Sequence, residues 1–388
     1  MVNRAATQAQ SRRVALAAKR QMIKRKDGGM RHEVVKSHSL ERRDWADVVT
    51  SKGEYHDNFA EASAARAFAR ASQARLFDRA EYLAPLHGAA FADKALKLLR
   101  VAEGEAELWL PLVEESPGDL KALSNWYSFR WSPVFTGAPG AIERDLLMRA
   151  AARALGKQAR AVTLSPLAEG DAQDLRVALA AEGWHVTVEQ CDENHILRLN
   201  GRSFEEYWAA RPGRLRSTVK RKGKSGAVEI RILDHYDEAA WNDYQTVYAR
   251  SWKPEEGSPD FLKGLAQSEG AGGSLRLGLA YIDGQCVAAQ FWTSEHGEAL
   301  IHKLAYDERY AKASAGTLLT HALFRHVIEQ DGVDLVDYGT GSDAYKRDWM
   351  EEIRPRFRLI ARRPGHPANW SGLAKARLAQ LVRRRSSV

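Results

Sequence analysis

The chain has 388 residues, of which 44% are hydrophobic and 28% are charged, and its formal net charge is +8. These proportions are ordinary for a soluble globular protein and exclude a disordered chain, a collagen and a multi-pass membrane protein. The length suffices for two domains of about 100–200 residues each.

The charge is unevenly distributed along the chain. Residues 1–30 carry a net charge of +7 and residues 354–388 carry +10, which leaves −9 for the residues between them. The sequence predicts a basic arm over 1–45 and a basic amphipathic helix over 366–388. Such a helix can lie on an anionic membrane or dock on the protein's own core. The basic ends favour an anionic membrane surface as partner, since no base-reading motif supports nucleic acid.

Cysteine use and hydropathy predict the compartment. The only two cysteines, Cys191 and Cys286, do not make a disulfide framework, which favours a reducing environment. The sequence has no Cys/His cluster, so we expect no metal site. It also has no run of about 18 apolar residues and no signal-peptide h-region, so we predict a cytoplasmic protein, peripheral at the inner face of the membrane.

The N-terminal half alternates helices and strands without a recognisable chemical motif. Its predicted elements are a helix over 59–79, a strand over 108–113, a helix over 141–155, a strand over 161–164 and a helix over 171–181. Two further strands, 184–190 and 196–199, are predicted to pair across a polar turn at 192–194.

The C-terminal half has a clearer order. A capped helix begins near Ser203, breaks at Pro212 and resumes through the cationic run 214–224. The elements that follow are predicted in the order β-α-α-β-β-β-α-β-α-β, listed as 228–232, 236–252, 258–268, 275–282, 286–294, 299–306, 317–330, 333–338, 343–350 and 357–361. This half is therefore also α/β.

The segment between the strand ending at Tyr306 and the helix starting near Thr317 is the best candidate for a phosphate site. Its last residues, 313–316, are small, and Lys312 adds positive charge. Small residues at a helix N-terminus leave backbone N–H groups free for a pyrophosphate. A simple helix cap would have the same sequence.

Several motifs in the C-terminal half together resemble a known family. They are Ser251-Trp252-Lys253 with Glu255 and Glu256, Val287 to Gln290, Lys303 to Asp307, Ser314 to Thr317, and Asp337 to Trp349. With the strand order, they resemble the GNAT acyltransferase fold, in the cellulose-biosynthesis-type acetyltransferase-like branch. This branch is similar to the Fem-type aminoacyl transferases, which pair two GNAT-like units.

The resemblance implies an α/β fold of tandem GNAT-like domains. A degenerate first domain is expected over 46–200 and a catalytic one over 201–365. It also implies an acyl-CoA-dependent N-acyltransferase, with acyl-CoA as a co-substrate and no permanently bound cofactor. The pyrophosphate would lie on Lys312, Ser314, Ala315, Gly316 and Thr317, although the first glycine of the family's loop is missing here.

The resemblance also suggests catalytic residues. A tyrosine in the fourth helix of the family often protonates the leaving thiolate, and Tyr345 occupies the matching element. Asp343 is the expected carboxylate at the site. The alternatives are a buried aromatic anchor for Tyr345 and a helix N-cap for Asp343.

The remaining candidates are spread over three segments. His302, on a central strand, and Glu255 are further catalytic candidates, and Trp252, Glu256 and Lys346 are candidates for binding the acceptor. The structural alternatives are a packed strand histidine, a solvated loop for the two glutamates and a surface lysine.

The basic ends of the chain and the resemblance to the family together suggest the kind of acceptor. Bacterial ceramide synthases, which acylate a sphingoid base, look like members of this branch. A basic enzyme at an anionic surface suits such a lipid-like amine. The alternatives are a polysaccharide acetyltransferase, a Fem-like aminoacyl transferase and a non-catalytic GNAT-like binding module.

Overall fold

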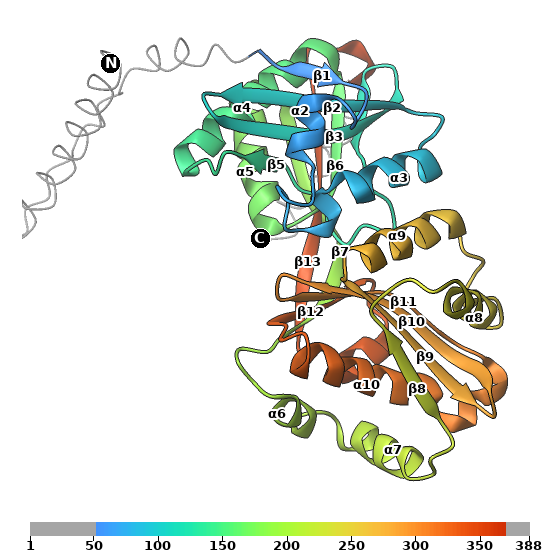
Figure 1. Cartoon of the computed structure of the whole chain (residues 1–388). Coiled ribbons are helices and arrows are strands. Elements are labelled where there is room, and N and C mark those ends of the chain that lie inside the picture. The colour runs from blue at the N-terminus through green and yellow to red at the C-terminus, as the bar shows by residue number, and fades with distance from the viewer. Residues whose placement is uncertain (1–51, 370–388) are drawn as a thin grey trace, which may run out of the picture. The chain divides into compact units, whose positions relative to one another are not determined.

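A computed structural model describes residues 52–369, so the predicted arm over 1–45 and most of the predicted helix over 366–388 lie outside the described residues. Within 52–369 the strands form one 13-stranded sheet (Figure 1). Its order is β1-β2-β3-β4-β6-β13-β7-β12-β11-β10-β9-β8, and β5 pairs with β3 beside this path. We call residues 52–200 the N-terminal half and residues 201–369 the C-terminal half.

The N-terminal half contains seven strands and five helical segments. The strands are β1 (Glu54–His56), β2 (Ala95–Glu103), β3 (Ala106–Ser116), β4 (Asp119–Ala122), β5 (Val134–Thr136), β6 (Ala161–Leu167) and β7 (His185–Arg198). The helical segments are α2 (Ala62–Ala67), η1 (Leu76–Asp78), α3 (Ala80–Ala90), α4 (Ala141–Gln158) and α5 (Glu169–Ala181).

The C-terminal half follows the predicted order. Its strands are β8 (Glu229–Leu233), β9 (Leu275–Ile282), β10 (Gln285–Glu295), β11 (Glu298–Tyr306), β12 (Leu335–Thr340) and β13 (Glu352–Arg362). Its helical segments are α6 (Phe204–Ala209), α7 (Gly213–Gly223), α8 (Glu238–Ala249), α9 (Pro259–Ala271), η2 (Glu308–Ala313), α10 (Ala315–Glu329), η3 (Ala344–Asp348) and η4 (Pro367–Asn369). The order of ten elements from β8 to β13 is confirmed, with η3 a single 3₁₀ segment.

The two halves repeat one topology. In each, three antiparallel strands are followed by a helix that crosses to a parallel neighbour: β4 pairs with β6 across α4, and β11 pairs with β12 across α10. The last strands are exchanged, because β7 pairs with β12 and β13 pairs with β6. The predicted domain boundary at 200/201 stays a prediction, because β7 of the N-terminal half pairs with a strand of the C-terminal half and β13 of the C-terminal half pairs with a strand of the N-terminal half.

The predicted turn at 192–194 is wrong, because β7 is one continuous strand of 14 residues. Asp192 lies opposite Arg356, a cross-strand pair of opposite charge, and the neutral Asn194 lies opposite Arg354 on β13. Asn194 is fully buried, and its Nδ2 donates to the buried carboxylate of Asp337 at 3.0 Å. A polar triplet that would suit a turn is therefore part of a continuous strand inside the sheet.

Helices cover the sheet on both faces. One core packs α4 and α5 against the strands of the N-terminal half, and another packs α6 and α10 against β9 to β12. A third core is shared between the halves, with Trp109 from one half and Trp241 and Phe291 from the other. At Gly339 (φ 68°), a Cβ would lie 2.6 Å from the ring of Phe129, so the halves contact each other here at a position where only glycine fits.

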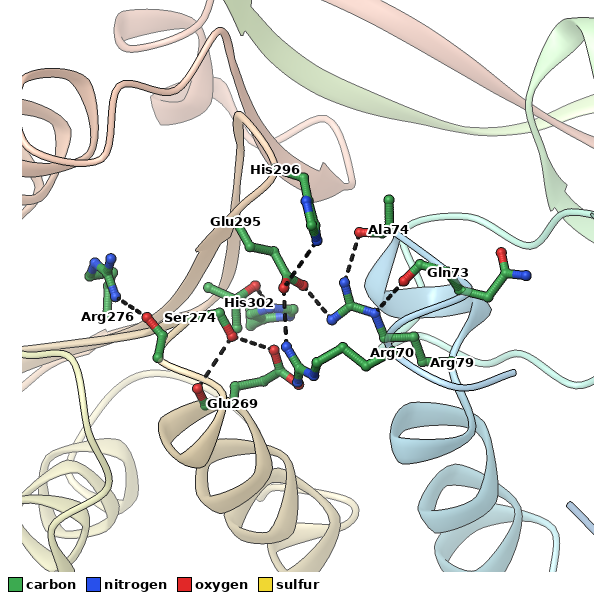
Figure 2. A network of polar contacts seen from close by, with 12 residues as sticks. Arg70, Gln73, Ala74, Arg79, Glu269, Ser274, Arg276, Glu295, His296 and His302 are labelled. Carbon is green, nitrogen blue, oxygen red and sulfur yellow. Dashed lines mark hydrogen bonds and ion pairs between the residues drawn. The ribbon is translucent and has the colours of Figure 1, made fainter. Parts of the chain in front are cut away.

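A buried ion-pair network also joins the two halves (Figure 2). Arg79 is fully buried, and its Nε and Nη2 donate to the carbonyls of Gln73 and Ala74, both at 2.8 Å. Its Nη1 pairs with Glu295 at 2.5 Å, and Arg70 pairs with Glu295 and with the buried Glu269. The helix predicted over 59–79 is confirmed only over α2 (Ala62–Ala67). It does not continue to 79, because the carbonyls of Gln73 and Ala74 bind the Arg79 guanidinium instead of helix amides.

We expect Arg79→Lys to lower the free energy of unfolding by about 2 kcal/mol, measured by urea denaturation. Lysine can keep the ion pair with Glu295 but cannot satisfy both carbonyls, and each lost hydrogen bond costs about 1 kcal/mol. Arg70→Lys is the matched control. The side chain of Arg70 is 27% exposed, so its loss should be under about 1 kcal/mol. Equal losses of unfolding free energy in the two variants would contradict a stabilising role for the bonds from Arg79 to the two carbonyls.

Candidate functional site

The parallel strands β11 and β12 stop pairing halfway along β11. Their register runs only from Glu298 opposite Leu335 to Leu300 opposite Asp337. β11 then continues to Tyr306 with β10 on one side, which leaves its other edge without a partner strand. Unpaired strand edges carry free N–H and C=O groups, so a ligand with amide groups can bind along this stretch.

A pocket of about 470 Å³ lies at this unpaired edge, and we call it the α10 pocket. It is formed by the end of β11, Tyr338 of β12, the first turn of α10 and the segment around η3. Seven of the predicted site residues line it, namely Trp252, Ser314, Ala315, Gly316, Thr317, Asp343 and Tyr345. The fold thus brings together residues that span 94 positions of the sequence.

The first turn of α10 opens into this pocket. Ser314 adopts the left-handed conformation (φ 59°, ψ 30°) and makes no side-chain cap bond. Leu318 N–H donates to Ser314 O at 3.1 Å, and the three amides before it lie ahead of the helical hydrogen-bond pattern. These amides and the helix dipole make the turn suitable for an anion.

Gln290 of β10 fixes this turn to the sheet. It is 1% exposed, and its Nε2 donates to Thr320 Oγ1 at 2.6 Å and to Gly316 O at 3.3 Å. Its Oε1 accepts from Trp292 Nε1 at 2.9 Å. The sequence prediction did not assign Gln290 a role, and only its place in the Val287 to Gln290 motif could have indicated one.

Tyr345 and Asp343 also line this pocket, from the segment around η3. Tyr345 is 38% exposed, and its ring packs edge-on against Tyr338 at 5.8 Å. Partial burial and then the Asp343 carboxylate raise the pKa of Tyr345 above its ordinary value, so the phenol keeps its proton. Asp343 stands at the N-cap of η3 without a side-chain cap bond, which leaves its carboxylate available to the pocket.

Five of the predicted residues do not line this pocket, namely Lys312, Lys346, His302, Glu255 and Glu256. Lys312 is exposed on η2. Lys346 is 3% exposed, and its Nζ donates to Gly341 O at 3.1 Å, so it ties η3 to the end of β12. His302 contacts Thr293 Oγ1 at 2.9 Å and packs against the ring of Phe291. Burial and then Lys303 lower the pKa of His302 to about 3.

Glu255 and Glu256 line a separate pocket of about 460 Å³ between α8 and α9, which we call the α8–α9 pocket. Lys253 also lines it. Burial and then Lys303 lower the pKa of Lys253, against the opposing effect of the Asp343 and Glu256 carboxylates. Because Asp343 belongs to the α10 pocket, Lys253 lies between the two pockets.

In the N-terminal half, the helix that corresponds to α10 is α4, and a side chain already binds the backbone at its start. Gly140 caps α4, and its N–H donates to Glu143 Oε2 at 2.8 Å in a capping box. The Glu143 carboxylate thus already accepts an N–H at the start of α4, whereas no side chain caps α10. This difference agrees with a first unit that has lost the site.

Comparison with known proteins agrees with this architecture. Residues 209–347 match a family model described as an acetyltransferase (GNAT) domain, and no curated protein matches the chain in sequence. FemX has 10% identity and a TM-score of 0.53, and the match covers 74% of this chain and 92% of FemX. L-PGS from Bacillus licheniformis has 15% identity and a TM-score of 0.51, over 81% of this chain and 94% of that one. A tandem GNAT protein from the clavulanic acid biosynthesis pathway has 14% identity and a TM-score of 0.45, over 79% and 98%.

The predicted fold class is therefore confirmed: the described chain has an α/β fold of two GNAT-like halves, and residues 209–347, most of the second half, match a GNAT acetyltransferase domain. FemX and L-PGS share the fold, which confirms the predicted relation to Fem-type proteins at the level of fold.

Proposed function

We propose that the protein transfers an acyl group from acyl-CoA to an amine. The observation that carries this proposal is the α10 pocket, where free helix amides, an unpaired strand edge and a protonated tyrosine converge. The amides at Ala315 to Thr317 would bind the pyrophosphate, and the edge of β11 would pair with the amides of the pantetheine arm.

The reaction needs one proton acceptor and one proton donor. The amine nitrogen forms a bond to the thioester carbonyl carbon, and the carbon–sulfur bond breaks. Asp343, directly or through water, takes the proton that the ammonium loses. Tyr345 donates its proton to the leaving thiolate and regains one from the nitrogen, which loses its second proton as the carbon–sulfur bond breaks, so that free CoA and an amide are formed. Holding both substrates together supplies much of the rate enhancement.

An acyl-transfer assay tests this proposal. Acetyl-CoA, octanoyl-CoA and palmitoyl-CoA are each mixed with sphinganine, glucosamine or an amino acid, and amide formation and free CoA thiol are measured. We expect an amide and an equal amount of free CoA with at least one pair. No product with any acyl-CoA would contradict the proposal.

A Fem-like aminoacyl transferase is the second candidate, because the fold similarity to FemX extends over both halves. It differs in the donor, which would be an aminoacyl-tRNA. The same assay with aminoacyl-tRNA separates the two candidates, and binding of this donor should weaken steeply with salt.

We further propose a lipid-like amine, such as a sphingoid base, as the acceptor and an anionic membrane as the place of reaction. α7 supports this with one buried residue, Leu215, and a dense set of cations at and just after it. They are Arg214, Arg216, Lys220, Arg221, Lys222 and Lys224. Within the described residues, no helix is long and apolar enough to cross a bilayer, so contact with lipid would occur at the surface.

We expect the double variant Lys220→Gln/Lys224→Gln to bind phosphatidylglycerol vesicles roughly 30-fold more weakly, because each cation near an anionic surface contributes about 1 kcal/mol. Vesicle sedimentation measures this. Lys157→Gln/Arg176→Gln, two exposed cations of the N-terminal half, is the matched control and should bind like the wild type. Equal loss in both variants, or binding of duplex RNA in preference to vesicles, would contradict a membrane surface at α7.

A further inference from the structure

Asp343 and Tyr345 lie on the segment that follows β12, and residues of the N-terminal half bind this segment at two points. The first point is Gly339. Its N–H donates to Asp337 Oδ1 at 2.8 Å, and Phe129 of the N-terminal half packs directly against it, so that a Cβ would lie 2.6 Å from the ring. The segment therefore leaves β12 in contact with Phe129.

The backbone of Phe129 binds the same place through a polar network. Its carbonyl accepts from Asn194 Nδ2 at 3.3 Å, and this amide group also donates to the Asp337 carboxylate at 3.0 Å. Asn194 and Asp337 are 0% and 2% exposed, and hydrogen bonds are electrostatically stronger out of water. The ring of Phe129 and its carbonyl thus both act on the start of the segment.

The second point is Gly341, two positions before Asp343. Its N–H donates to Asp192 Oδ1 and to Glu193 O, both at 3.1 Å and both on β7. Lys346 Nζ donates to Gly341 O at 3.1 Å. Gly341 is therefore bound at its N–H and at its carbonyl, and the Asp192 carboxylate is one of the two acceptors on the N–H.

Phe129 is itself fixed to the N-terminal half. It is 5% exposed and lies in the segment 123–133, which joins β4 to β5 without forming a helix or strand. Two residues further on, Trp131 N–H donates to Pro166 O at 2.7 Å and Trp131 Nε1 donates to Pro111 O at 2.9 Å. These bonds hold the segment against the sheet of the N-terminal half, so Phe129 provides a fixed surface.

We infer that Phe129 and Asp192 are positioning residues for the proposed site. They hold the start of the segment that carries Asp343 and Tyr345. Asp343 makes no side-chain cap bond and Tyr345 is 38% exposed, so their placement depends on the backbone before them. A misplacement of about 1 Å can cost about 100-fold in rate. The inference rests on the proposed function only for the reaction that the two side chains carry out.

Amide hydrogen exchange of the full chain tests the inference without reference to catalysis. Exchange of a peptide covering 339–346 should be about tenfold faster in Phe129→Leu, because local opening is easier where a packing contact is lost. It should be about threefold faster in Asp192→Ala, where Glu193 O still accepts from Gly341 N–H. Asp192→Asn keeps an oxygen that can accept this bond and should exchange like the wild type.

Two matched controls change the same kinds of side chain outside the α10 pocket. Phe68→Leu alters a fully buried ring of the N-terminal half that packs against Trp109. Glu114→Ala removes a carboxylate that accepts from Gly118 N–H at 3.0 Å. Both controls should leave exchange of 339–346 as in the wild type, even where they lower the melting temperature.

The kinetic test separates positioning from stability. In acyl transfer, Phe129→Leu should lower kcat about tenfold and Asp192→Ala about threefold, with KM for acyl-CoA within about twofold of the wild type. Asp192→Asn and both controls should keep the wild-type kcat. Unchanged exchange in Phe129→Leu, or a loss of kcat no larger than that of Phe68→Leu, would overturn the inference. Faster exchange as expected, in a protein that forms no amide from any acyl-CoA, would leave the positioning standing and refute the proposed function.

Discussion

Gly316→Asp is expected to weaken CoA binding by at least about 100-fold without lowering the melting temperature. Gly316 lies in the first turn of α10 and lines the α10 pocket. A carboxylate about 5 Å from a bound diphosphate repels it by about 3 kcal/mol at an effective dielectric constant near 20, and 1.4 kcal/mol is tenfold in affinity. Isothermal titration with CoA measures the loss.

The fold should tolerate this change well. A Cβ at Gly316 would lie 3.7 Å from the side chain of Tyr306, an ordinary contact. An acidic residue in the first helical turn is favourable to the helix dipole. Gly316→Asn, of the same size but neutral, is the matched control and should lose less than about tenfold. If Asp and Asn lose affinity equally, size and not charge governs this position, and the phosphates bind elsewhere.

Much of the C-terminal half could be predicted because its signals are local. The alternating strand at 228–232, the Ser203 cap and the turn at Asp283–Gly284 each depend on a few neighbouring residues. Ser203 does accept from Glu206 N–H, as a cap of this type should. Such features need no knowledge of the rest of the chain.

The exchanged strands could not be predicted in this way. Nothing within 192–194 shows that Arg354 and Arg356 lie opposite, because the two segments are more than 150 residues apart. Without those partners, three polar residues indicate a turn. The same distance hid Tyr127, whose partner Glu256 lies 129 positions away.

The site could be predicted where one element carries several of its residues. The run from Ser314 to Thr317 lies together by chain connectivity, and all four residues line the α10 pocket. Lys346 is a different case, since only the folded loop shows that carbonyls at Thr340 and Gly341 bind its ammonium. The aromatic residues at 241, 244 and 248 have helical spacing, which predicts a packed face and does not distinguish a core from a pocket wall.

The first unit also shows why a fold repeat need not repeat a site. α4 and α10 occupy equivalent places in the topology, but Glu143 caps one and no side chain caps the other. One carboxylate at a helix start is enough to exclude a phosphate through charge. The N-terminal half nevertheless contributes Phe129 beside Gly339 and Tyr127 beside Glu256, so it still contacts residues of the C-terminal half.

Tyr345→Phe is expected to lower kcat by about 100- to 1000-fold while CoA affinity stays within about twofold of the wild type. General acid catalysis contributes about 10²- to 10⁴-fold, and phenylalanine keeps the ring that packs against Tyr338. Steady-state kinetics and titration with CoA measure the two quantities. Tyr338→Phe is the matched control, because Tyr338 lines the same pocket but is 5% exposed, and its kcat should fall less than about fivefold.

The pH dependence of kcat gives an independent check on the same residue. An ordinary tyrosine loses its proton near pH 10, but partial burial and the Asp343 carboxylate raise the pKa of Tyr345. The acid form therefore persists above pH 10, and kcat should not decline below that pH through loss of this proton. Asp343→Asn removes the carboxylate, so the pKa of Tyr345 should fall and the decline should move to lower pH. If kcat of Asp343→Asn declines at the same alkaline pH as kcat of the wild type, the leaving thiolate takes its proton from another donor.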